Sequence, residues 1–155
     1  DNAEKMLKIF ASNFFSFNSF HLNGDQKGGQ YSSFTYRPFT LEGNFAFAQG
    51  VHEMLIQSYN DRIEIFPAIP NSWKDVSFHN LRTEGAFLVS AKKENGVADE
   101  VTITATQANR LFIKLPFKTW LIKGIERKEI VDNGNNISAV FLKKGQTIIF
   151  KNGYE

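Results

Sequence analysis

The stretch RPFTLEGNF, residues 37–45, places the carboxylate of Glu42 and the amide of Asn44 on either side of Gly43. A carboxylate on a glycine-bearing loop can act as a general acid or base, or can hold a reacting water in place. The same carboxylate just ahead of a helix can instead stabilise the positive end of the helix dipole, by about 0.3–1 kcal/mol. The residue types alone leave both interpretations of Glu42 open.

Two helices joined by a long loop are predicted to position Glu42. Apolar residues at spacings of three and four predict a helix over residues 4–17 and a second one from Asn44, its N-cap, to about Ser58. Gly50 inside the second helix suggests that another backbone passes close to it. Residues 18–40 are rich in Asn, Ser, Gly and Thr and predict a loop of a length that is uncommon unless it is functional.

Beyond residue 60 the apolar period changes from helical to two. Val101, Ile103 and Ala105 alternate with threonines in the clearest example, and Asn95-Gly96 is predicted to form a hairpin turn, as is the segment 132–134. The strands are expected at 62–66, 76–81, 86–93, 97–106, 110–115, 119–124, 128–131, 138–142 and 147–151. Eight or nine such strands favour an antiparallel β-sandwich. The predicted fold class is α+β, helical over 1–60 and β over 61–155.

Composition excludes several classes of function. The balance of 18 basic and 16 acidic residues, without a long basic run, gives no footprint for nucleic acid. No apolar run approaches the ~20 residues that cross a bilayer, so we expect no membrane partner. No cysteine is present, and the three histidines lack metal-ligand spacing, so we expect neither a metal nor a cofactor. The first residue is Asp1 and not Met, so we expect a piece of a longer or processed protein.

Two further motifs have an ordinary explanation beside the functional one. His52-Glu53 forms half of a zinc-protease motif, but Ile56 stands where the second His would be. Trp73 and Trp120 could stack on sugar rings, although tryptophans in a β-rich chain more often pack in the core or against another domain.

An ordered series of segments resembles a known family. The series is PFTLEGNF at 38–45, AQGVHEMLIQS at 48–58, IEIFPAIP at 63–70, Trp73, and LRTEGAF at 81–87. It is similar to the end of glycoside hydrolase family 95, the inverting α-L-fucosidases, in which an (α/α)6 barrel precedes a C-terminal β domain. The resemblance implies that residues 1–60 are the last helical segment of that barrel and that 61–155 are its β-sandwich domain.

The resemblance also assigns site residues. The family's usual wording is P-F-Q-I-D-G-N-F-G, whose Asp supports the asparagines that orient the hydrolytic water; that Asp falls on Glu42. Tyr36, Arg37 and Asn44 are then expected to bind or support the sugar, with Tyr36 standing where a His is common. Glu reaches about one methylene further than Asp, and a misplacement of ~1 Å can cost ~10²-fold in rate.

The resemblance therefore implies a C-terminal fragment of a bacterial, periplasmic or extracellular glycosidase acting on fucosylated glycans or related α-L-sugars. The general acid would lie in upstream barrel segments, so the fragment alone is expected to be inactive. The alternative is a non-catalytic β-sandwich module that binds glycans or braces a neighbouring domain. The two differ in whether Glu42 affects turnover of the parent protein.

Overall fold

The computed structural model describes residues 2–34 and 36–153 of the chain. The chain forms two compact units, Asp1–Met54 and Leu55–Glu155, which we call the helical unit and the β unit. Each unit is described by itself.

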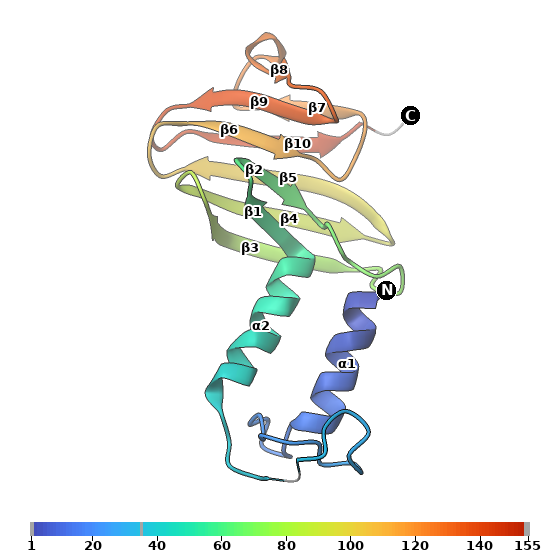
Figure 1. The fold of residues 1–155 in the computed structure, drawn as a ribbon. Helices are drawn as coiled ribbons and strands as arrows, with labels where there is room; N and C mark the ends of the chain where they lie inside the picture. Colours follow the sequence, from blue (N-terminus) through green and yellow to red (C-terminus); the bar gives the residue numbers. More distant parts are fainter. Residues whose placement is uncertain (1, 35, 154–155) are drawn as a thin grey trace. The chain divides into compact units, whose positions relative to one another are not determined.

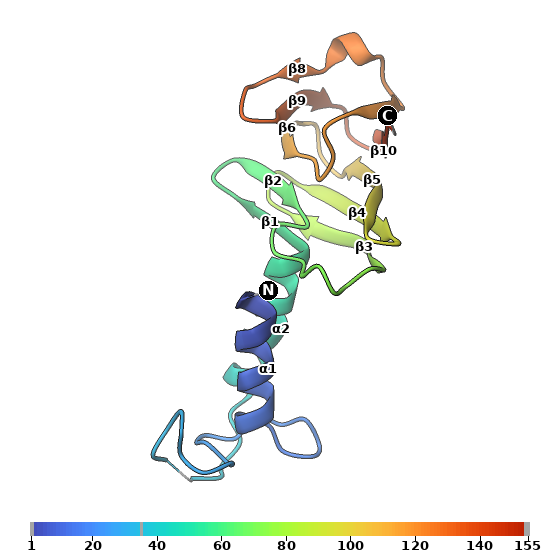
Figure 2. The same cartoon turned by 90° about the vertical axis from the view of Figure 1, so that its right-hand side faces the viewer.

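The helical unit contains α1 (Asn2–Phe14) and most of α2 (Leu41–Leu55), which run side by side in opposite directions (Figure 1, Figure 2). They approach closely where the side chain of Leu7 lies over Gly50, so close that a Cβ added at Gly50 would be 2.9 Å from Leu7 Cδ2. The rings of Phe10 and Phe47 stack with centroids 6.4 Å apart. The prediction of a close neighbour at Gly50 is correct, but that neighbour is a side chain and not a backbone.

The helix boundaries differ from the sequence prediction at all four ends. α1 begins at Asn2, two residues before the predicted start at Glu4. α1 ends at Phe14 and not at Phe17, because the backbone turns back there: Leu22 N donates to Phe14 O at 2.6 Å. α2 begins at Leu41, three residues before the predicted N-cap Asn44, so Glu42 lies inside the first helical turn. α2 ends at Leu55, because Ile56–Tyr59 is a strand and not the last helical turn.

The segment between the helices is irregular, as predicted, and is held by short backbone ladders. Isolated β-bridges join Phe15 to His21 and Leu22 to Phe39. Asn23 N donates to Pro38 O and Thr40 N donates to His21 O, both at 3.0 Å. The loop is thus hydrogen-bonded to itself directly before α2, which fixes the path by which the chain enters the helix.

The β unit is a sandwich of two five-stranded sheets. The first sheet has the order β1-β2-β6-β9-β8, and its strands are β1 (Ile56–Tyr59), β2 (Arg62–Ile65), β6 (Asn109–Lys114), β9 (Ile137–Leu142) and β8 (Val131–Asp132). The second has the order β3-β4-β5-β10-β7, with β3 (Val76–Thr83), β4 (Phe87–Glu94), β5 (Val97–Ala105), β10 (Thr147–Asn152) and β7 (Trp120–Lys123).

Most strand pairs are antiparallel, with one exception in the first sheet. β2 and β6 are parallel, and they pair only at Ile63 with Ile113 and Glu64 with Lys114. The sequence predicted a wholly antiparallel sandwich, and this parallel pair departs from that prediction. A parallel pair here follows from the chain path, because β2 is joined to β6 through three strands of the other sheet.

The core of the β unit lies between the two sheets and follows the predicted period of two. Val101, Ile103 and Ala105 of β5 are buried, whereas Thr102 and Thr104 are half-buried. The opposite sheet contributes in the same way from every other position of β2 and β6. The buried core residues are Ile56, Ile63, Ile65, Phe78, Phe87, Val89, Ala91, Val101, Ile103, Ala105, Leu111, Ile113, Ile130, Val140, Leu142, Ile148 and Phe150.

The turn predicted at Asn95-Gly96 is confirmed, the turn predicted at 132–134 is displaced to Gly134–Asn136, and one strand prediction is wrong. Asn95 and Gly96 have φ of 51° and 84° and close β4 onto β5 as a two-residue hairpin. The segment after Asp132 joins β8 to β9 in antiparallel pairing. The strand expected over 128–131 is instead the 3₁₀ turn Arg127–Glu129 followed by β8, because Glu126 and Glu129 form a reciprocal capping box there.

The inter-sheet core yields a stability prediction. Phe150 is fully buried, and its ring meets Trp120 edge to face with centroids 5.1 Å apart, so Phe150→Ala should lower the free energy of unfolding by about 3–5 kcal/mol. Phe141 on β9 is 58% exposed, and Phe141→Ala should change the free energy of unfolding by less than about 0.5 kcal/mol. Urea unfolding followed by tryptophan fluorescence measures both, since both tryptophans belong to the β unit. Equal effects of the two changes would contradict the described packing.

Candidate functional site

Glu42 lies in the first turn of α2 with its side chain exposed. Within the described parts of the chain its carboxylate has no hydrogen-bond or ion-pair partner. A position in the first turn satisfies the dipole interpretation of Glu42, since the free N–H groups of a helix start favour a negative charge. The same position leaves the carboxylate free to meet a ligand, so the two roles are compatible.

Asn44 has a structural role in the loop. Its Oδ1 accepts a hydrogen bond from His21 N at 2.8 Å, and its Nδ2 donates to Ser19 O at 2.7 Å. Both ends of the amide are thus occupied by the backbone of the loop. Asn44 ties α2 to residues that precede it by more than twenty positions, and this tie holds Glu42 in place relative to the loop.

His21 lies against the start of α2 at Gly43. Its ring stacks on Phe10 with centroids 5.1 Å apart and an interplanar angle of 12°, and its Nδ1 is 2.6 Å from Thr40 Oγ1. A Cβ added at Gly43 would overlap the His21 ring. The glycine between Glu42 and Asn44 is therefore required by this close approach, and its role is packing.

Tyr36 and Arg37 are both exposed, and Tyr36 has 63% of its surface accessible. Neither side chain has a hydrogen-bond or ion-pair partner among residues 2–34 and 36–153. Both precede Pro38 on the segment that is hydrogen-bonded to residues 21–23. Tyr36, Arg37 and Glu42 are therefore unpartnered side chains of one short segment, whereas Asn44 is engaged.

Exposed aromatic rings surround this segment. Phe20 and Phe39 contact each other with centroids 5.2 Å apart, and both are exposed, as is Phe34. Rings that are open to solvent next to unpartnered polar groups are the usual composition of a site that holds a partly apolar ligand or another protein surface.

Asp25 organises the loop, and the sequence analysis missed it. Only 1% of Asp25 is exposed, and its carboxylate accepts from Lys27 N at 2.8 Å and Tyr31 N at 3.0 Å. The backbone N–H of Tyr31 most of all, and then that of Lys27, holds the pKa of Asp25 below its ordinary value. The available signal was the Asp followed shortly by Gly28-Gly29, a composition typical of turns in which an acidic side chain caps backbone N–H groups.

The other candidate motifs have structural explanations. Nδ1 of His52 is buried without a partner, and its neighbour Glu53 accepts from Gln49 Nε2 at 2.6 Å. No group of three or more His, Asp or Glu among the described residues is placed to hold a metal ion. The ring of Trp120 meets Phe150 edge to face. The Arg127 guanidinium lies 3.8 Å from the centre of the Trp120 ring and covers one face of it. No described helix has the length and apolarity needed to cross a membrane.

Comparison with known proteins identifies the family of the β unit. The model of the glycoside hydrolase family 95 C-terminal domain matches residues 57–150, more than half of the chain. The chain belongs to glycoside hydrolase family 95. Alpha-L-fucosidase 2 of Arabidopsis thaliana is 40% identical over 73 residues, which cover 45% of this chain and 9% of that protein. The chain thus spans only a small part of this relative's length.

The contact of His21 with Gly43 gives a matched pair of predictions. Gly43→Ala should destabilise the helical unit by about 1–3 kcal/mol, because the added methyl meets a ring that is stacked on Phe10 and held at Thr40. Gly50→Ala should change stability by less than about 1 kcal/mol, because its methyl meets only the movable end of Leu7 and alanine favours the helix. Hydrogen exchange of the α2 amides measures both. A larger loss of stability in Gly50→Ala than in Gly43→Ala would contradict the packing role assigned to Gly43.

The buried carboxylate of Asp25 predicts acid sensitivity of the loop. Because its pKa is lowered in the folded state, its stabilising contribution is complete above the ordinary value of 3.8 and is lost as the pH falls through the lowered value. The amide signals of Lys27 and Tyr31 in ¹H–¹⁵N spectra should therefore shift or broaden only below that ordinary value. In Asp25→Asn this transition should be absent. A transition centred above 3.8 would contradict the hydrogen bonding described.

Proposed function

We propose that this chain is the C-terminal part of an inverting glycosidase that acts on α-L-fucosides or related α-L-sugars. Membership of glycoside hydrolase family 95 supports a carbohydrate as substrate, and the name of the plant relative supports an α-L-fucoside. The observation that carries the site assignment is the exposed, unpartnered carboxylate of Glu42 beside the hydrogen-bonded Asn44.

In this proposal Glu42 helps to activate water, and Tyr36 and Arg37 contact the sugar. Inversion requires a general acid on one side of the glycosidic bond and an activated water on the other. Glu42 supports asparagines from upstream segments of the parent protein, and those asparagines orient the water that attacks the sugar. Asn44 has a positioning role, since its amide is already hydrogen-bonded to the loop backbone.

In this proposal the helical unit, Asp1–Met54, would be the last part of an (α/α)6 barrel, a segment whose end the sequence analysis placed at residue 60. α1 has no buried residue, although it carries an apolar stripe, and Met6 and Phe45 are exposed on α1 and α2. Apolar faces without cover are expected of helices that pack against further helices of the same domain. The general acid would come from those segments, so the chain alone should be inactive. Its location would be periplasmic or extracellular, as exported polysaccharide-degrading enzymes require.

The β unit would brace the barrel in this proposal. All buried residues of its inter-sheet core come from the β unit itself, as expected of a supporting domain. The alternative of sugar stacking on Trp120 is not favoured, because Arg127 covers one face of the ring and Phe150 meets it edge to face.

A test of Glu42 uses the full-length parent protein and an aryl α-L-fucoside. Glu42→Gln should lower kcat by about 10²-fold, because the amide keeps the shape of the side chain and removes its charge. Glu42→Asp retains the carboxylate but withdraws it by about one methylene, a displacement that can itself change the rate by ~10²-fold, so Glu42→Gln is the variant that measures the loss of charge. The isolated chain should show no turnover.

Glu94→Gln is the control. Glu94 pairs with Lys92 at 2.7 Å at the exposed end of β4, and such a pair contributes about 0–1 kcal/mol, so turnover should be unchanged. Unchanged turnover in Glu42→Gln, with the same folded yield, would rule out the proposed role of Glu42.

A further inference from the structure

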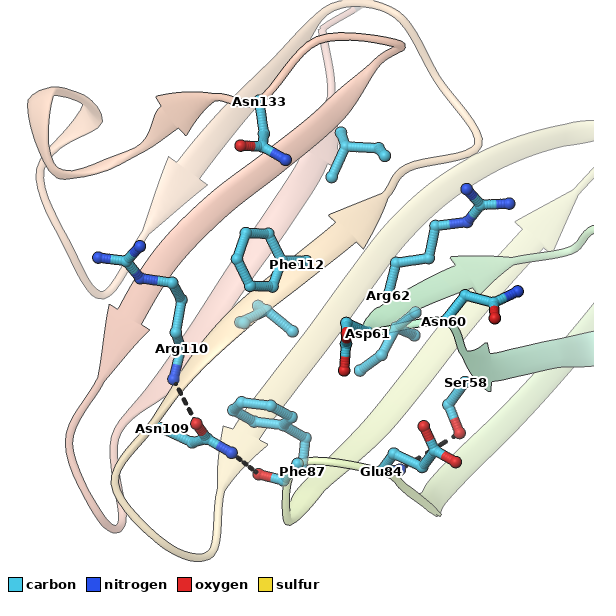
Figure 3. Close-up of a pocket in the computed structure, with 14 residues that line it drawn as sticks. Ser58, Asn60, Asp61, Arg62, Glu84, Phe87, Asn109, Arg110, Phe112 and Asn133 are labelled. Carbon is cyan, nitrogen blue, oxygen red and sulfur yellow. Dashed lines mark hydrogen bonds between the residues drawn. The ribbon is translucent and has the colours of Figure 1, made fainter.

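A pocket of about 440 Å³ opens in the β unit (Figure 3). This volume lies within the range of roughly 300–1,000 Å³ that is typical of small-molecule sites. Its floor is apolar and fully packed: Ile63, Phe87 and Leu111 are all buried.

The irregular pairing of the first sheet creates the pocket. β2 pairs with β6 only at Ile113 and Lys114, so the first four residues of β6, from Asn109 to Phe112, have no partner strand on the β2 side. The turn between β1 and β2 ends beside this gap, and the turn that leads from β3 to β4 contributes Glu84 and Gly85. The pocket is thus built from ends of both sheets.

The polar groups on its walls are unpartnered. The carboxylates of Asp61 and Glu84, the guanidinium of Arg110 and the amides of Asn60 and Asn133 make no hydrogen bond or ion pair within the described residues. Figure 3 shows these side chains around one space, with the ring of Phe112 among them.

The backbone holds two of these groups rigidly. Asn60 and Asp61 both have φ of 57° and form a two-residue hairpin turn, in which Tyr59 pairs with Arg62. Asn109 is also fixed, since its Nδ2 donates to Gly85 O at 3.1 Å and its Oδ1 accepts from Arg110 N at 2.8 Å. The backbone positions of Asn60, Asp61 and Asn109 are therefore set before a ligand binds.

The chemistry of the walls selects a neutral polyhydroxyl ligand. The lining includes carboxylates, which only accept, and guanidinia, which only donate, whereas a sugar hydroxyl both donates and accepts. The lining holds two carboxylates, Asp61 and Glu84, and two guanidinia, of which that of Arg62 also pairs with Glu64 at 3.8 Å, so no excess of positive charge is left to favour an anion. The partly exposed ring of Phe112 offers an apolar face for the C–H groups of a sugar.

We propose that this pocket is a sugar-binding site of the β unit, separate from the proposed role of Glu42. It takes one or two rings of a neutral oligosaccharide, with Asp61 accepting from and Arg110 donating to ring hydroxyls. Binding here requires no chemistry at Glu42, so the two proposals stand or fall independently.

The test is an NMR titration of the ¹⁵N-labelled chain with L-fucose, D-galactose and lactose. At least one sugar should shift the amides of Asn60, Gly85 and Arg110 in a saturable manner, with a dissociation constant of roughly 1–10 mM, as expected of so small a ligand. Asp61→Asn, which keeps a residue suited to positive φ, and Arg110→Gln should each weaken binding by at least about tenfold.

Arg82→Gln is the matched control for Arg110→Gln, because Arg82 is an exposed arginine on β3 outside the pocket, and it should leave binding unchanged. No saturable shift with any of the three sugars, or shifts confined to residues away from the pocket, would overturn the proposal. So would full binding by both pocket variants. Saturable binding of inorganic phosphate that depends on Arg110 and not on Asp61 would overturn it in favour of an anion site.

Discussion

The close approach of the His21 ring to Gly43 determines the geometry of the helical unit around Glu42. The ring is stacked on Phe10 of α1, is held at Thr40, and lies where any side chain at position 43 would be. The backbone N–H of His21 also donates a hydrogen bond to Asn44 Oδ1. One histidine thus joins α1, the loop and the start of α2, and Glu42 projects from the point at which all three meet.

The two units reach stability in different ways. The β unit buries a continuous set of side chains between its sheets, so its fold is largely explained by its own residues. The helical unit relies on aromatic stacking, the Asn44 amide and the Asp25 carboxylate, and it leaves α1 without a buried residue. This contrast is expected if the helices belong to a larger helical domain and the sandwich is a domain by itself.

Sequence patterns predicted what depends on periodic burial and failed where single contacts decide. The alternation around Ile103 predicted β5, and Asn95-Gly96 predicted its hairpin, because period and turn chemistry are local. Ile56–Tyr59 continued the helical spacing of α2, and only its pairing with β2 makes it a strand. The role of Asp25 could not be predicted from the sequence. Its carboxylate accepts hydrogen bonds from backbone N–H groups that come close to it only in the folded loop. Glu42 was singled out from the residues around it, but only the family resemblance gave it a role in catalysis.

The same limit applies to the pocket of the β unit, whose residues come from four separate parts of the chain. Asn60-Asp61 is a hairpin turn in sequence terms, and nothing local distinguishes it from the turn at Asn95-Gly96. The difference arises because β2 is parallel to β6 and pairs with it at only two residue pairs. The Asn60-Asp61 turn therefore lies beside the part of β6 that has no partner strand on that side. Asn95 N, in contrast, is bound by Asp75 at 2.8 Å and Gly96 N by Lys74 O at 2.8 Å. The backbone N–H groups of the Asn95-Gly96 turn are thus bound by the segment before β3, whereas the Asn60-Asp61 turn presents its side chains to a cavity.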